Sequence, residues 1–210
     1  MSVLVTKEAP DFISSAILAD GSIVEDFQLS KFKGKKIVLF FYPLDFTFVC
    51  PSEILAHHKR AKAFDQRDTV IIGVSIDSKH THNAWRNTQV NDGGIGSIDF
   101  PLVSDMNHSI MSSYGITHPE GTALRASFLI DENFVIRHQV VNDHPLGRNV
   151  DEMLRMVDAL DFHTENGEVC PAGWNKGEDG MQENAESVAC LLYTSPSPRD
   201  ATLSRMPSSA

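Results

Sequence analysis

Two short apolar runs separated by a helical segment are the feature that most constrains the fold of this chain. Residues 37–42 (IVLFFY) and 69–76 (TVIIGVSI) are dense in β-branched and aromatic side chains, which favours buried strands. Between them, residues 52–64 predict a helix. Strands that are apolar almost throughout and that alternate with helices indicate an α/β sheet covered on both faces.

The rest of the chain continues this alternation and adds a hairpin. Residues 81–90 predict a helix with Trp85 as its core anchor, and residues 150–162 predict a helix with one apolar face. Residues 127–130 and 134–141 predict two strands joined by a tight turn. The length of 210 residues, 41% of them hydrophobic, suits one compact core. We therefore expect a thioredoxin-like α/β fold with a mixed central sheet flanked by helices.

Cys50 stands where the first predicted strand leads into the first predicted helix. The N-terminus of a helix has unpaired N–H groups and a partial positive charge, which stabilise a thiolate. Pro51 suits the first helical position, so we expect Cys50 at or beside the N-cap. Unpaired cysteines are also commonly buried and inert, so position alone leaves a reactive and a structural role equally open.

Two other residues have an ordinary and a functional interpretation. Cys170 lies in a segment punctuated by Gly and Pro, which predicts a surface loop after the last helix. It is an inert thiol or, together with a reactive Cys50, a resolving thiol. No C-x-x-C pair is present, which argues against a thioredoxin-type dithiol site. Arg125 is either a solvated side chain or a guanidinium aimed at a thiolate.

Composition and charge exclude several classes of function. The net charge of −10 argues against a nucleic-acid partner, and no apolar run approaches the length of a membrane span. Three scattered cysteines and an N-terminus without a secretory pattern predict a cytoplasmic protein. Adjacent His57 and His58, and His80 and His82 two apart, cannot share a helix face in pairs, so we expect no metal site.

The last residues differ in character from the rest. From Cys190 onward the chain is rich in Ser and Pro and has no helical or strand period. A natural disordered tail and a foreign, non-native sequence are both consistent with this, and we favour the non-native tail over residues 190–210.

Five blocks of sequence resemble one known family. Residues 40–51 (FFYPLDFTFVCP) are similar to the signature of the typical 2-Cys peroxiredoxins, the alkyl hydroperoxide reductase C type. Residues 74–85, 124–131, 141–152 and 167–172 resemble further blocks of that family in the same order. The resemblance implies a thioredoxin-like domain over residues 1–162, with an N-terminal extension, and a resolving-cysteine segment over residues 163–189.

The same resemblance implies roles for individual residues. Cys50 would be the peroxidatic cysteine, in a pocket completed by Pro43, Thr47 and Arg125. Glu53 and Arg148 would belong to the surrounding polar network. Cys170 would be the resolving cysteine, forming an intersubunit disulfide with Cys50.

The implied function is that of a thiol-specific peroxidase in antioxidant defence. It would reduce hydrogen peroxide and alkyl hydroperoxides through a sulfenic acid, with no cofactor, as a homodimer or a decamer. Thioredoxin or a dedicated flavoprotein disulfide reductase would recycle it. A cysteine hydrolase fits less well, because His57 and His58 lie beyond the activated end of the helix. A holdase or redox-signalling role alongside peroxidase activity stays open.

Overall fold

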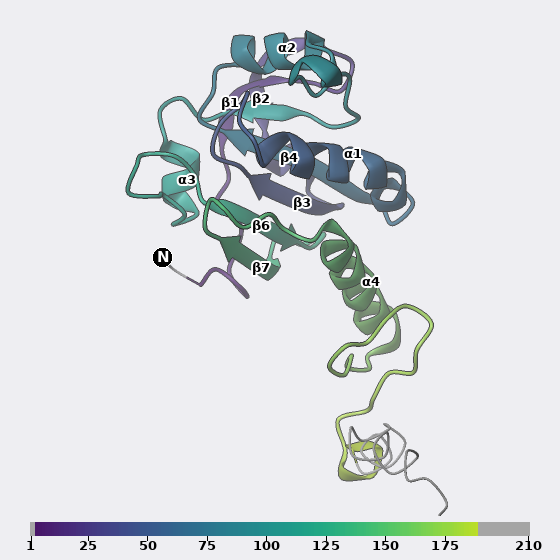
Figure 1. Ribbon diagram of the computed structural model, residues 1–210. Coiled ribbons are helices and arrows are strands. Elements are labelled where there is room, and N and C mark those ends of the chain that lie inside the picture. Colours follow the sequence, from purple (N-terminus) through teal and green to yellow (C-terminus); the bar gives the residue numbers. More distant parts are fainter. Residues whose placement is uncertain (1–2, 189–210) are drawn as a thin grey trace, which may run out of the picture. The chain divides into compact units, whose positions relative to one another are not determined.

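The computed structural model describes residues 3–188, and its centre is a single seven-stranded sheet (Figure 1). The strand order is β2-β1-β5-β4-β3-β6-β7. Strand β4 pairs in parallel with β3 and β5, and every other pair is antiparallel, so the sheet is mixed, as predicted. The strands are β1 (Ile13–Ile17), β2 (Ile23–Gln28), β3 (Lys36–Phe41), β4 (Thr69–Ser75), β5 (Leu102–Ser104), β6 (Arg125–Ile130) and β7 (Ile136–Asn142).

Helices α1 to α4 and two short 3-10 helices accompany the sheet within residues 3–188. Helix α1 packs on β4, and α2 packs against β1 and β5. The helices are α1 (Cys50–Asp65), α2 (Lys79–Asn87), α3 (Ser109–Ser113) and α4 (Val150–Asn166), with η1 (Leu29–Phe32) and η2 (Val90–Asp92). Among residues 3–188, no helix combines the length and the apolar character that crossing a bilayer requires.

Side chains of β3 alternate between the two faces of the sheet. Phe40 stacks on His57 of α1 with ring centroids 4.1 Å apart. Its neighbour Phe41 points the other way, 5.2 Å from the ring of Tyr114 at the end of α3. All six residues of β3 are buried, because both faces of the strand are covered. Trp85 of α2 is also fully buried, as predicted.

The predicted elements exist, with shifted ends. Helix α1 begins at Cys50 with Val49 as its N-cap, so Pro51 occupies the second helical position rather than the first. Helix α2 spans residues 79–87 instead of 81–90. The side chain of Ser78 caps its start by accepting from the backbone N–H of Thr81 at 3.1 Å, and Thr88 is already extended.

The chain forms two compact units, the first ending at Val157 and the second starting at Asp158. The sheet and helices α1 to α3 belong to the first unit. In the second, Val169 and Met181 form an antiparallel bridge, and the rings of Phe162 and Trp174 lie 4.8 Å apart. The expected tail over residues 190–210 lies outside the described residues.

Candidate active site

The thiol of Cys50 lies at the start of α1, just beyond the loop that follows β3. The side chain is completely buried, at 0% exposure. As the first residue of the helix, it lies beside backbone N–H groups that have no partner within the helix. Partial positive charge therefore surrounds the sulfur on the helix side.

Arg125, the first residue of β6, supplies a full positive charge at the same sulfur. Its Nη1 lies 3.4 Å from the Sγ of Cys50 and 2.8 Å from Oε2 of Glu53. Its Nε donates to the backbone carbonyl of His144 at 2.6 Å. Arg125 is 4% exposed, so its guanidinium is enclosed and these contacts fix its direction toward the thiol.

Glu53 lies one turn after Cys50 on α1 and connects Arg125 to a second buried arginine. The Nε and Nη2 of Arg148 donate to Oε1 and Oε2 of Glu53, both at 2.8 Å. Arg148 also donates from Nη1 to Ser127 Oγ at 3.0 Å and to the carbonyl of Ala126. We call Glu53, Arg125 and Arg148 the Glu53 network.

The charge of Glu53 is stabilised despite its burial. Burial alone would raise the pKa of its carboxyl group, but the hydrogen bonds and charge of Arg148, with the charge of Arg125, lower it below its ordinary value. Glu53 is therefore ionised at neutral pH and holds both guanidiniums in place.

Pro43 and Thr47 lie in the loop between β3 and α1. Pro43 is buried, two residues after the end of the strand. Thr47 is half-buried, and its Oγ1 donates to the carbonyl of Leu44 at 2.9 Å. This hydrogen bond closes a turn and fixes the position of the hydroxyl, whose lone pairs remain available.

A buried polar cluster anchors the same loop and was not predicted. The carboxylate of Asp45 accepts from Tyr42 Oη at 2.8 Å and lies 2.7 Å from Nδ1 of His82. The backbone N–H of Asp45 donates to Asp77 at 2.8 Å. Burial raises the pKa of Asp45, although His82 and Tyr42 act in the opposite direction. These residues come from two stretches of the chain, 42–45 and 77–82, so no single local sequence pattern signals them.

His57 has a structural environment. It is buried on α1, its Nδ1 lies 2.8 Å from the carbonyl of Glu53, and its ring stacks on Phe40. Burial and the charge of Arg148 lower its pKa to about 4, so the ring is neutral at neutral pH. These contacts argue against His57 as the base of a cysteine hydrolase.

Cys170 belongs to the second compact unit. It is half-buried, and its Sγ lies 3.5 Å from the carbonyl of Ala159 in α4. The neighbouring antiparallel bridge between Val169 and Met181 joins the two sides of this segment. Both Cys50 and Cys170 are thiols in this structure.

Comparison with known proteins identifies the family. A model described as "AhpC/TSA family" matches residues 5–139, and one described as "C-terminal domain of 1-Cys peroxiredoxin" matches residues 159–190. Alkyl hydroperoxide reductase C of Buchnera aphidicola subsp. Acyrthosiphon pisum (strain APS) is 59% identical over 192 residues, covering 90% of this chain and 98% of that relative. Peroxiredoxin-1 of Gallus gallus is 48% identical over 181 residues, covering 86% and 90%.

A solved structure agrees with these sequence matches. Reduced 2-Cys peroxiredoxin of Plasmodium vivax superposes with a TM-score of 0.89 at 46% identity, covering 92% of this chain and 100% of that one. The resemblance found in the five sequence blocks and the thioredoxin-like fold are thereby confirmed. The chain belongs to the AhpC/TSA family, among the peroxiredoxins.

Proposed function

We propose that this chain, a peroxidase by family, reduces peroxides through Cys50 and completes its cycle with Cys170. The observation that carries the proposal is the 3.4 Å approach of Arg125 to a buried thiol at the start of a helix. A guanidinium and a helix N-terminus together favour the thiolate, which is the nucleophilic form of cysteine.

The first step forms one S–O bond and breaks one O–O bond. The Cys50 thiolate attacks the terminal oxygen of hydrogen peroxide or an alkyl hydroperoxide and becomes a sulfenic acid. The other peroxide oxygen leaves with the electron pair as hydroxide or alkoxide and takes up a proton, giving water or an alcohol. Sulfur is oxidised and the peroxide is reduced.

The pocket residues act on the charge that moves during this step. Arg125 donates to the peroxide oxygens as negative charge shifts toward the leaving oxygen. The hydroxyl of Thr47, whose proton is donated to the carbonyl of Leu44, accepts a hydrogen bond from the O–H of the peroxide. Pro43 excludes water from the thiolate. Glu53 and Arg148 act through Arg125, by holding its guanidinium in this orientation.

Cys170 resolves the sulfenic acid. The thiol of Cys170 of a second subunit attacks the Cys50 sulfur, forming an intersubunit disulfide and releasing water. A dithiol reductant, thioredoxin or a flavoprotein disulfide reductase, then reduces this disulfide and returns both thiols.

We also propose that two chains form a homodimer and that these dimers assemble into a decamer. Strand β7 ends the sheet of this chain, and an edge strand can pair with that of a second copy. The sparse cysteines suit a reducing compartment, and we place the protein in the cytoplasm.

An activity assay with cysteine variants tests the proposed cycle. Peroxide consumption is coupled to NADPH oxidation through thioredoxin and thioredoxin reductase, and separately through a flavoprotein reductase. We expect no turnover from Cys50→Ser. For Cys170→Ser we expect reduction of one equivalent of peroxide without sustained turnover. Normal activity of Cys50→Ser would refute the role of Cys50, whatever the reductant.

A further inference from the structure

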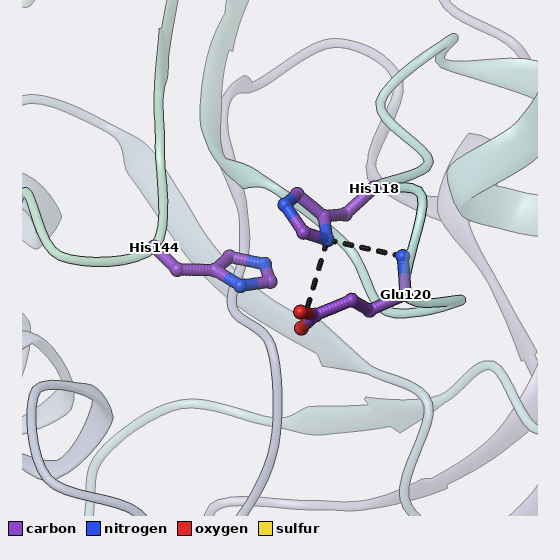
Figure 2. A group of neighbouring side chains, drawn as sticks. All are labelled: His118, Glu120 and His144. Carbon is purple, nitrogen blue, oxygen red and sulfur yellow. Dashed lines mark hydrogen bonds and ion pairs between the residues drawn. The ribbon is translucent and has the colours of Figure 1, made fainter.

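Two histidines and a glutamate from separate segments meet on the surface of the first unit. Figure 2 shows His118 and Glu120, from the turn before β6, facing His144 from the loop after β7. One potential ligand atom from each residue lies within 4.8 Å of those of the other two. Both histidines are half-buried, and Glu120 is exposed.

The backbone holds both sides of this group in place. The turn carrying His118 is closed by a hydrogen bond from its N–H to the carbonyl of Thr122 at 2.8 Å, and by a bridge between Thr117 and Ala123. The two imidazole rings lie with their centroids 4.0 Å apart. An ion binding here would therefore meet ligands that need little rearrangement.

Neighbouring groups also favour the tautomers that bind metal. The Nε2 of His144 lies 3.2 Å from the carbonyl of Ala123 and 3.3 Å from Oγ1 of Thr122. A proton donated from Nε2 to that carbonyl leaves the lone pair on Nδ1. The Nδ1 of His118 accepts from the N–H of Glu120 at 3.2 Å, so this nitrogen is unprotonated. A metal ion at this nitrogen would replace that hydrogen bond.

The charges around the group suit a cation. Glu120 Oε2 and Asp143 Oδ1 each lie 3.9 Å from a nitrogen of His118. Two carboxylates beside two imidazoles favour a negative potential at this site. Without an ion, the two carboxylates repel each other. A bound divalent ion would attract both carboxylates, so both effects favour its binding.

We propose that His118, Glu120 and His144 bind one Zn²⁺ ion. Two imidazoles and a carboxylate form a known ligand set for tetrahedral zinc, with water in the fourth position. Imidazole ligands favour zinc over magnesium or calcium, which prefer oxygen. The sequence alone did not indicate this site, because its histidines come from two distant loops and neither belongs to an adjacent pair.

The proposed site shares a residue with the surroundings of Cys50. His144 offers its side chain to the metal and its backbone carbonyl to Nε of Arg125, at 2.6 Å. Zinc would therefore fix the loop that supports the Arg125 guanidinium, and its binding would change the rate at which Cys50 reacts with peroxide. This second consequence depends on the proposed peroxidase function, whereas the binding itself does not.

The binding test must exclude the cysteines, which also bind zinc. It uses the full chain without an affinity tag, with Cys50→Ser, Cys170→Ser and Cys190→Ser. Zinc is titrated against a chromogenic chelator, and Co²⁺ is added separately to record its visible spectrum. We expect one zinc per chain and a tetrahedral cobalt spectrum without a thiolate charge-transfer band.

Variants locate the ion within the chain. His118→Ala and His144→Ala should each weaken zinc binding at least tenfold, whereas His80→Ala, at an exposed position on α2, should leave it unchanged. Circular dichroism checks that each variant is folded. Affinity weaker than millimolar, or equal affinity in all three variants, would overturn the site.

The effect on the reaction is measured separately. Reduction of one equivalent of peroxide is followed in a chain carrying Cys170→Ser and Cys190→Ser, with and without zinc, and in the same chain with His118→Ala. We expect zinc to change the rate at least twofold more in the first chain than in the second. Equal effects would overturn the link to Arg125 and leave the binding result to decide the site.

Discussion

The buried side chain of Arg125 contacts three different groups: the Cys50 sulfur, the Glu53 carboxylate and the His144 carbonyl. The planar guanidinium has several donors in fixed directions, and a lysine ammonium has only one nitrogen. A lysine at this position would retain the charge and lose most of this geometry. Geometry and charge at the pocket can therefore be separated by one substitution.

We expect Arg125→Lys to slow the reaction of Cys50 with peroxide by about 100-fold to 1,000-fold, the usual effect of losing a donor to a developing oxyanion. Stopped-flow measurement of the first turnover gives this rate. Arg60→Lys is the matched control, because Arg60 forms an exposed ion pair with Asp151. A wild-type rate in Arg125→Lys would contradict the proposed role.

Glu53 gives the protein a pH-dependent contribution to stability. Its pKa is lower in the folded protein than its ordinary value. The ionised group therefore stabilises the fold above the unfolded pKa, and this contribution is lost as the pH falls through the folded pKa.

We expect Glu53→Gln to reduce the free energy of unfolding by about 3 kcal/mol at neutral pH, because two buried guanidiniums lose their counter-charge. The difference from wild type should shrink as the pH is lowered below about 4, near the ordinary value for Glu. Urea unfolding at several pH values measures it. Glu152→Gln, which breaks a more exposed pair with Arg155, should change stability by less than about 1 kcal/mol.

At the scale of elements, the sequence predicted those strands and helices whose own hydrophobic pattern is long and clear. Strands β3 and β4 and helix α4 are long and strongly patterned, and all three were anticipated. Strands β1 (Ile13–Ile17) and β2 (Ile23–Gln28) were missed, because both mix polar and apolar residues; β2 is an edge strand and β1 is its neighbour. The three residues of β5 and the five of α3 are too short to show a period.

The features of the candidate site also divide into those that a local sequence pattern predicts and those that depend on tertiary contacts. The position of Cys50 at a helix start follows from a local strand-turn-helix pattern. The directions of Arg125 and Arg148 depend on the pairing of β6 with β3 and on the loop after β7, which bring distant residues together. Backbone acceptors such as the carbonyl of His144 leave no signal in the sequence.

The first turn of α1 should open when Cys50 forms the disulfide proposed with Cys170. A disulfide requires Cα atoms about 4.4–6.8 Å apart, and a completely buried helical Cys50 cannot offer its sulfur to another chain. We expect faster hydrogen exchange at residues 50–54 in the oxidised protein than in the reduced protein. The amides of β3 serve as the internal control. Equal protection of this turn in both forms would refute the expectation.

At the scale of the whole molecule, the two proposed redox residues occupy different compact units. The groups that contact Cys50 all belong to the unit that contains the sheet. Cys170 belongs to a smaller unit, which has its own aromatic contact between Phe162 and Trp174. A thiol carried by a separate unit can meet its partner on another chain.

A mixing experiment tests the intersubunit disulfide. Chains with Cys50→Ser and chains with Cys170→Ser, both also carrying Cys190→Ser and distinguished by mass, are mixed and treated with peroxide. We expect a mixed disulfide-linked dimer on non-reducing electrophoresis, and none from either chain alone. Absence of the mixed dimer, with subunit exchange verified by native mass spectrometry, would refute pairing between subunits.

The Glu53 network has one more consequence, which concerns electroneutrality. Two guanidiniums and one carboxylate leave a single uncompensated positive charge in the protein interior. The thiolate proposed for Cys50 would cancel it, whereas a sulfenic acid or a disulfide, being neutral, would not. An unbalanced buried charge destabilises its surroundings. Oxidation of the Cys50 sulfur would thus weaken the packing around it. The oxidised site would therefore favour the local opening of α1 that reaction with Cys170 requires.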